Sequence, residues 1–103
     1  MRVYQVKVKG IDMVLEPVFD SRRKAEEYSS KYKNRKTIVK QSSIEETSHV
    51  FRILVDDIDG YELKEELYTS IDIARENITS DNERIVKENI LTDSIKEYDL
   101  IEV

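Results

Sequence analysis

The sequence contains no cysteine and no tryptophan, and it has one histidine, one proline and two glycines among its 103 residues. The absence of cysteine excludes disulfide bonds, thiolate catalysis, zinc–thiolate sites and iron–sulfur clusters. A single histidine, His49, excludes a multi-histidine metal site within one chain. Two isolated glycines cannot form the glycine-rich loops that hold nucleotide phosphates. We therefore expect no cofactor and no metal site.

Long apolar runs are also absent. No stretch approaches the roughly 18 uncharged apolar residues of a membrane-spanning helix, and the first residues alternate in polarity instead of forming a signal-peptide block. We expect a cytoplasmic protein that does not bind membranes. Because 39% of the residues are hydrophobic and 38% are charged, the chain is typical of one small folded domain over residues 1–103.

An internal repeat organises this domain. Residues 3–8 (VYQVKV) return 47 positions later as residues 50–55 (FRILV after Val50), and residues 38–40 return at 85–87 on the same offset. Residues 18–21 match residues 67–70 at an offset of 49, as Ala25 matches Ala74. This difference predicts a two-residue insertion in the second hairpin and a two-residue deletion after the second helix. We predict pseudo-repeats over 1–47 and 48–94 and a closing strand over 95–103, in which Tyr98 is equivalent to Tyr4 and Phe51.

Each repeat has the pattern strand, strand, helix, strand. Polarity alternates along the strands, and Pro17 predicts either an edge position for the second one or an unpaired position in its ladder. Asp20 or Ser21 is expected to cap the first helix, and Thr69 or Ser70 the second. The sequence therefore predicts an α+β fold with a mostly antiparallel sheet and two helices on one face, and it leaves the strand order open.

Charge divides unevenly between the repeats. Residues 1–47 hold 11 Lys and Arg against 7 Asp and Glu, whereas residues 48–103 hold 6 against 15. The acidic residues of the second repeat concentrate on its hairpin, at Asp56, Asp57, Asp59, Glu62, Glu65 and Glu66. The basic residues of the first repeat concentrate on and after its helix, with Arg22, Arg23, Lys31, Lys33, Arg35 and Lys36 as the main candidates for contacts with phosphates.

These charges allow four interpretations. The acidic hairpin, with Tyr61 as an aromatic anchor, could dock onto a basic surface of another protein, including a host enzyme or a host protein that normally holds nucleic acid. The basic cluster could bind nucleic acid, an alternative that the net charge of −5 opposes. The basic surface of one copy could meet the acidic hairpin of another in a homodimer. Each cluster could also be a solvated surface. We favour the first interpretation, a protein that inhibits or adapts its partner.

The sequence offers little support for an enzyme. Asp57, Asp59, Gly60 and Glu66 match four places of a calcium-binding EF-hand loop, but Val55 stands where the first ligand is required. His49 has no nucleophile motif beside it and is expected in a surface loop. We therefore predict a non-enzymatic protein.

Residues 19–21 and 24–28, which follow a short hairpin, loosely resemble a module of small uncharacterised proteins of low-GC Gram-positive bacteria and their phages. About 30 residues of each repeat share this resemblance, and the second repeat departs from it at Asn77, where the first has Tyr28. The resemblance implies an accessory protein of a phage or mobile element and assigns no functional residue.

Overall fold

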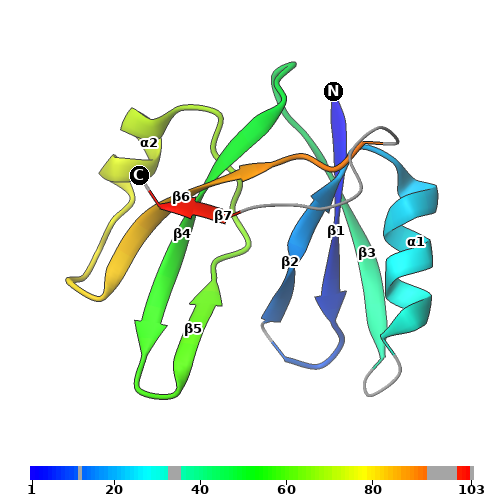
Figure 1. Cartoon of the computed structure of the whole chain (residues 1–103), viewed down its shortest axis with the longest axis horizontal. Helices are drawn as coiled ribbons and strands as arrows, with labels where there is room; N and C mark the ends of the chain where they lie inside the picture. The colour runs from blue at the N-terminus through cyan, green and yellow to red at the C-terminus, as the bar shows by residue number, and fades with distance from the viewer. Residues whose placement is uncertain (12, 33–35, 93–99, 103) are drawn as a thin grey trace.

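The computed structural model describes residues 1–11, 13–32, 36–92 and 100–102. It contains seven strands and two helices within these ranges (Figure 1). They are β1 (Arg2–Val8), β2 (Met13–Phe19), α1 (Arg22–Lys31), β3 (Thr37–Ser43), β4 (His49–Asp57), β5 (Gly60–Leu63), α2 (Ile71–Glu76), β6 (Glu83–Asn89) and β7 (Leu100–Glu102). The α+β fold class is confirmed, and so is the strand, strand, helix, strand order of each repeat.

The two repeats fold in the same way. The first forms a sheet of order β2-β1-β3 and the second a sheet of order β5-β4-β6-β7, with every strand pair antiparallel. Tyr4 pairs with Phe19 in the first sheet, and the equivalent Phe51 bridges to Tyr68 in the second. The first strand of each repeat, β1 or β4, thus lies between the other two strands of its repeat. β2, which contains Pro17, is an edge strand, one of the two predicted alternatives.

Serine side chains begin both helices. Ser21 accepts a hydrogen bond from the backbone N–H of Lys24, and Ser70 accepts one from Ile73, each at 3.5 Å. These contacts satisfy N–H groups that have no partner inside the first helical turn. The caps therefore lie at the serine of each predicted pair of candidates.

Strand register confirms the insertion and corrects the deletion. Val8 pairs with Met13 across the first hairpin and Val55 with Glu62 across the second, so the second hairpin is two residues longer. In the third strands, Val39 lies opposite Val6, and Ile85 lies opposite the equivalent position of the second repeat. The structural offset is therefore 46, and three residues are deleted. The sequence match was wrong by one because two adjacent apolar residues stand at this point in each repeat.

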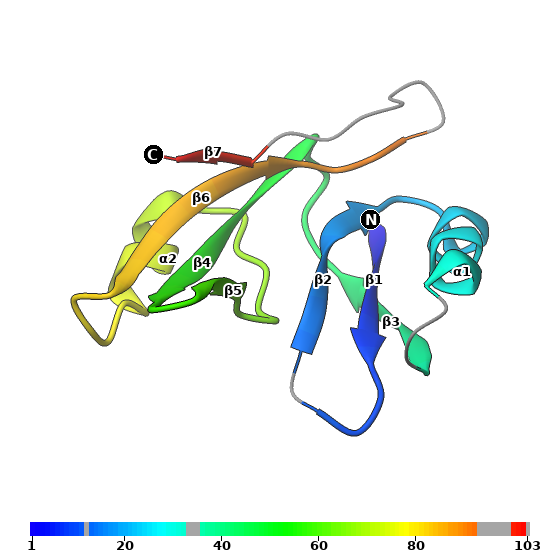
Figure 2. The ribbon, with the colours of Figure 1, turned by 60° about the horizontal axis from the view of Figure 1, so that its bottom comes forward.

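The two sheets pack face to face, so the predicted arrangement of both helices on one sheet is replaced by two sheets with one helix each. Tyr4, Val6 and Val8 face α1, where they pack with Ala25 and the half-buried Tyr28 and Tyr32. On the opposite face of β1, Val3 joins Val18, Val50 and Ile90 in a core between the sheets. In both views α1 and α2 lie at opposite ends of the molecule with the sheets between them (Figures 1 and 2).

The chain after β6 continues from the second sheet onto the first. The Leu91 N–H donates to Val18 O at 2.8 Å, and Leu91 O accepts from the Asp20 N–H at 3.0 Å, in a short parallel bridge to β2. The closing strand β7 pairs with the other edge of β6. Tyr98, the predicted third equivalent of Tyr4, lies outside the described residues.

Candidate functional site

The most exposed feature of the second repeat is the tip of the β4–β5 hairpin. Asp57 pairs with Gly60 across a two-residue turn, Ile58-Asp59, and Gly60 adopts φ +144°, a conformation that side-chain-bearing residues rarely take. The Asp57 carboxylate accepts the Ile58 N–H at 2.7 Å, which holds the entry to the turn. This local chemistry places Ile58 and Asp59 at the extreme end of the hairpin.

Ile58 is 98% exposed at this tip, with an aspartate on each side of it. Burying a side chain of this size in an apolar environment stabilises by about 1.5–3 kcal/mol, and here none of that is gained within the chain. The equivalent Ile11, in the turn between β1 and β2, is 46% exposed. The two hairpin turns lie at the same end of the molecule, at the bottom of Figure 1.

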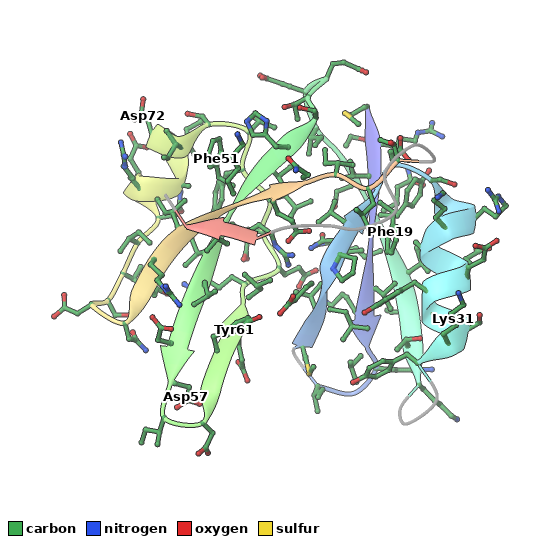
Figure 3. The ribbon with its side chains drawn as sticks, viewed as in Figure 1. Phe19, Lys31, Phe51, Asp57, Tyr61 and Asp72 are labelled. Carbon is green, nitrogen blue, oxygen red and sulfur yellow. The ribbon has the colours of Figure 1, made fainter. Side chains whose placement is uncertain are left out.

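Three carboxylates remain solvent-facing near this tip. Asp57, Asp59 and Glu62 are exposed and form no ion pair with any residue that the structure describes. Tyr61 is 49% exposed on the same hairpin, as its predicted role as an anchor requires, and Figure 3 shows it on β5 above Asp57. We use the name hairpin tip for these residues together with Ile58. The structure therefore brings four of the seven predicted residues together.

Asp56 and Glu65 form ion pairs with other residues of the chain. The Asp56 carboxylate pairs with the Arg84 guanidinium at 3.0 Å on the neighbouring strand β6. Glu65 pairs with Lys7 at 2.9 Å and with Lys40, both from the first repeat. The expectation that Glu65 belongs to an exposed acidic surface is wrong, because the chain turns inward after β5 and carries this residue to the interface between the sheets. The two lysines lower the pKa of Glu65.

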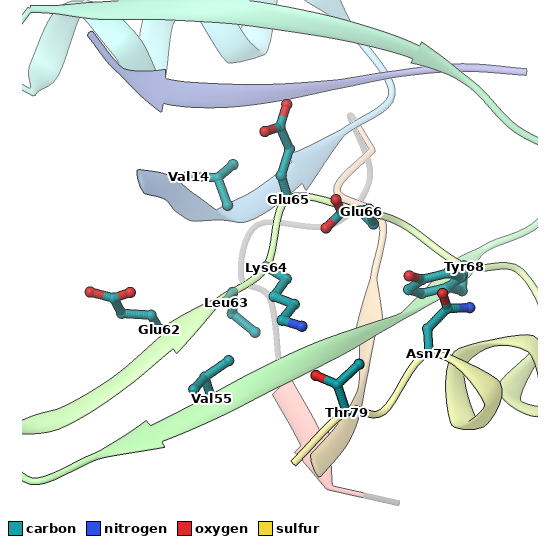
Figure 4. A pocket seen from close by; sticks show the side chains of 10 residues that line it. All are labelled: Val14, Val55, Glu62, Leu63, Lys64, Glu65, Glu66, Tyr68, Asn77 and Thr79. Carbon is teal, nitrogen blue, oxygen red and sulfur yellow. The ribbon is translucent and has the colours of Figure 1, made fainter. Parts of the chain in front are cut away.

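Glu66, the seventh predicted residue, is exposed and lines a cavity of about 560 Å³ that Figure 4 shows from close by. Lys64 also lines this cavity, and its ammonium group pairs with Glu83 at 2.5 Å. The same Glu83 accepts the backbone N–H groups of Thr79 and Ser80 at 2.6 and 3.2 Å. Lys64 and Thr79 together hold the pKa of Glu83 down to about 2. At this cavity Lys64 is thus already paired with Glu83.

The Tyr61 hydroxyl contacts the first repeat. It donates to a carboxylate oxygen of Glu16 on β2, and this hydrogen bond raises the pKa of Tyr61. The backbone carbonyl of Glu16 accepts from the buried Arg52 at 2.6 Å. Glu16 therefore joins the hairpin to the interior of the molecule, a role that its sequence position does not indicate.

The basic residues of the first repeat are less available than predicted. Arg22 lies 3.7 Å from Glu26 and Arg23 lies 2.8 Å from Glu27, each one turn along α1. The Arg22 guanidinium also lies 5.3 Å from the centre of the Tyr4 ring. Lys31 and Lys36 are exposed near the end of α1, and Lys33 and Arg35 lie outside the described residues.

Other candidates for chemistry find no support in the described residues. They contain no group of three or more His, Asp or Glu arranged to hold a metal ion, and neither described helix has the length and apolar run needed to span a bilayer. His49 is the first residue of β4 and not part of a loop, and its ring stacks edge-on against Phe51 at 5.3 Å. The half-buried position and aromatic partner are those of a packing residue.

Comparison with known proteins found no matching family model, no matching curated protein and no matching solved structure. At the hairpin tip, sequence reasoning missed Ile58. A large aliphatic side chain inside an Asp-Ile-Asp-Gly turn was the available signal, since turns normally carry small or polar residues.

Proposed function

We propose that this protein is a non-enzymatic binding module that docks its hairpin tip onto a basic surface of another protein. The observation that carries the proposal is Ile58, whose side chain is 98% exposed between Asp57 and Asp59. An apolar side chain between two carboxylates is suited to enter a small pocket whose rim carries lysines and arginines.

The electrostatics of the two repeats support a basic partner. The exposed carboxylates of the hairpin tip have no cation beside them in the described chain, whereas Asp56 and Glu65, which lie closer to the sheets, are paired. Negative charge left on a projecting hairpin steers association with a positively charged surface and adds specificity. Inhibition or adaptation of a host protein, in a cytoplasmic and phage-type setting, is the context that the sequence suggests for this binding.

The structure supplies matched control residues for a test. Ile73 on α2 is 51% exposed and Asp72 beside it has an 84% exposed side chain, and both lie at the end of the molecule away from the hairpin tip. Ile58→Ser and Asp57→Lys remove the apolar anchor and one charge of the tip. Ile73→Ser and Asp72→Lys make the same chemical changes elsewhere.

The experiment is affinity capture from a lysate of a low-GC Gram-positive bacterium with the wild-type protein and the four variants in parallel. We expect a basic protein that the wild type and both α2 variants retain and that both tip variants lose. Its association with the purified wild type should slow as salt rises from about 50 to 300 mM, because screening weakens charge steering. Retention that is equal for tip and α2 variants would overturn the proposal.

The Ile58→Ser variant should leave the fold intact. Ile58 has almost no contacts to lose, so Ile58→Ser should change the free energy of unfolding by no more than about 0.5 kcal/mol. Urea denaturation of the wild type and the variant measures this difference. A loss of capture by a variant of unchanged stability then reports on binding alone.

A further inference from the structure

A second cavity, of about 350 Å³, lies over the edge strand β2, between α1 and β5. Its floor is apolar and includes Val14, Leu15 and Leu63, which are 7–8% exposed and belong to the core of the molecule. A volume of this size is at the small end of the range found for ligand sites, so it suits one side chain better than a large molecule. The cavity therefore offers apolar contact to a thin, extended group.

Two phenol rings and two carboxylates stand around this floor. Tyr28 comes from α1, Tyr61 and Glu62 from β5, and Glu16 from β2. The Glu16 carboxylate accepts a hydrogen bond from the Tyr61 hydroxyl. The pKa of Tyr28 is raised by burial and by the negative charge of Glu16. The rings and the acids therefore surround one small volume, and none of its lining residues that the structure describes is a lysine or an arginine.

This combination selects an organic cation. Aromatic ring faces attract ammonium and guanidinium groups, and carboxylates pair with them, whereas an anion would meet Glu16 and Glu62. The apolar floor adds a requirement for methylene groups next to the charge. Lysine and arginine side chains meet both requirements, because each has an aliphatic stem and a cationic end.

The cavity adjoins the hairpin tip through shared residues. Tyr61 and Glu62 line the cavity and belong to the same four-residue strand that leaves the turn at Gly60. A protein seated on Ile58 would therefore have part of its surface beside the cavity. We infer that the cavity between α1, β2 and β5 receives a lysine or arginine side chain of the partner; this inference rests on the proposed function.

The first test uses small probes and the whole protein. Nα-acetyl-arginine amide and Nα-acetyl-lysine amide are titrated into isotope-labelled protein, with Nα-acetyl-norleucine amide as the uncharged probe of similar length. We expect the two cations to shift the amide signals of β2, β5 and α1 with dissociation constants of about 1 mM, the scale for so small a ligand. The neutral probe should bind at least about tenfold more weakly. Equal shifts by all three probes, or none, would overturn the inference.

Variants then locate the site. Glu16→Gln keeps an acceptor for the Tyr61 hydroxyl and removes the charge, and Tyr61→Leu removes an exposed ring. Each should weaken the cationic probes at least about fivefold. Glu66→Gln removes an exposed carboxylate that lines the other cavity and not this one, and it should leave the affinity for the cationic probes unchanged. If Glu16→Gln keeps the amide signals of a folded protein but binds the cationic probes as tightly as the wild type, the assignment is wrong.

The two proposals fail separately. If Ile58→Ser abolishes capture of the partner while Glu16→Gln does not weaken it, the hairpin tip binds the partner and the cavity has no part in it. If the cationic probes bind the cavity while tip and α2 variants capture proteins equally, the cavity is a cation site and the proposed function is wrong. Loss of partner affinity in both Ile58→Ser and Glu16→Gln supports both.

Discussion

Gln5 and Arg52 occupy equivalent positions in the two repeats, and both side chains are buried where the two sheets face each other. Gln5 donates to the Glu65 carbonyl at 3.2 Å. Arg52 donates to the Glu88 carboxylate at 2.9 Å and to the Glu16 and Lys64 carbonyls at 2.6 and 3.4 Å. One guanidinium thus connects β2, the chain after β5 and β6.

Removing this guanidinium should destabilise the protein strongly. Arg52→Met leaves the Glu88 carboxyl and two carbonyls without their donor in a region closed to water, a change that costs about 3–5 kcal/mol. Urea denaturation measures the loss. The control is Arg75→Met, which breaks an exposed pair with Asp72 and should cost less than about 1 kcal/mol.

A double variant separates the buried charge from the packing. Arg52→Met with Glu88→Leu removes both charges and keeps much of the volume, so it should recover most of the stability that Arg52→Met loses. If the double variant is less stable than Arg52→Met alone, the contribution of Arg52 comes from its hydrogen bonds to the carbonyls and not from pairing with Glu88.

Stability should be greatest in weakly acidic solution. Burial raises the pKa of Glu88 from 4.5 to about 7, against the opposing effect of Arg52. The contribution of Glu88 to the stability of the folded state is therefore complete below pH 4.5 and is lost as pH rises to about 7. Lys64 lowers the pKa of Glu83 to about 2. The contribution of Glu83 to stability is therefore complete above pH 4.5 and is lost as pH falls towards 2. Urea midpoints between pH 2 and 8 should therefore pass through a maximum.

Two variants assign the limbs of this profile. Glu88→Gln should flatten the decline above pH 4.5, and Glu83→Gln should flatten part of the decline below it, where Glu65 also contributes in the same direction. A decline towards neutral pH that survives in Glu88→Gln would mean that another group controls that limb.

Nucleic acid should not bind. Arg22 and Arg23 already have glutamates one turn away, and the hairpin tip adds negative charge. A gel-shift assay with DNA and RNA oligonucleotides at about 50 mM salt, where phosphate contacts are strongest, should show no retarded band. A retarded band that Arg22→Glu with Arg23→Glu abolishes would establish the alternative function predicted from the sequence.

The protein should not associate with itself. If the hairpin tip serves a foreign partner, light scattering should give the mass of one chain at low and at high salt. A doubled mass at low salt that Asp57→Lys abolishes and Asp72→Lys preserves would replace the foreign partner with a second copy of this chain, since both changes add equal charge.

Much of the fold was predictable because its signals are local. Alternating polarity identified the strands, and the pairs of polar residues before each helix placed the caps to within one residue. The match of residues 3–8 with 50–55 predicted two units of one design. The one-residue error in the third strands arose at Ile38-Val39 and Ile85-Val86, where two adjacent apolar residues satisfy either register. Only pairing with the neighbouring strand distinguishes them.

The candidate site was predictable only in part. Asp57, Asp59 and Glu62 remained exposed because they lie in or near the tight turn of a β-hairpin, which local sequence specifies well. Glu65 was misplaced because its partners Lys7 and Lys40 lie 58 and 25 positions away. Glu16 and Tyr28 were missed as cavity residues for a similar reason, since β5 reaches them only in the folded chain.

By itself, the sequence determined that two similar units of strands and helices form, where their helices begin, and that the second unit carries the negative charge. Those properties depend on interactions within a few residues of the chain. The tertiary structure decided that the strands divide into two sheets, that Arg52 is buried between them, and which acids face water. Burial depends on what lies opposite a side chain in space, and here the opposite residue belongs to the other repeat.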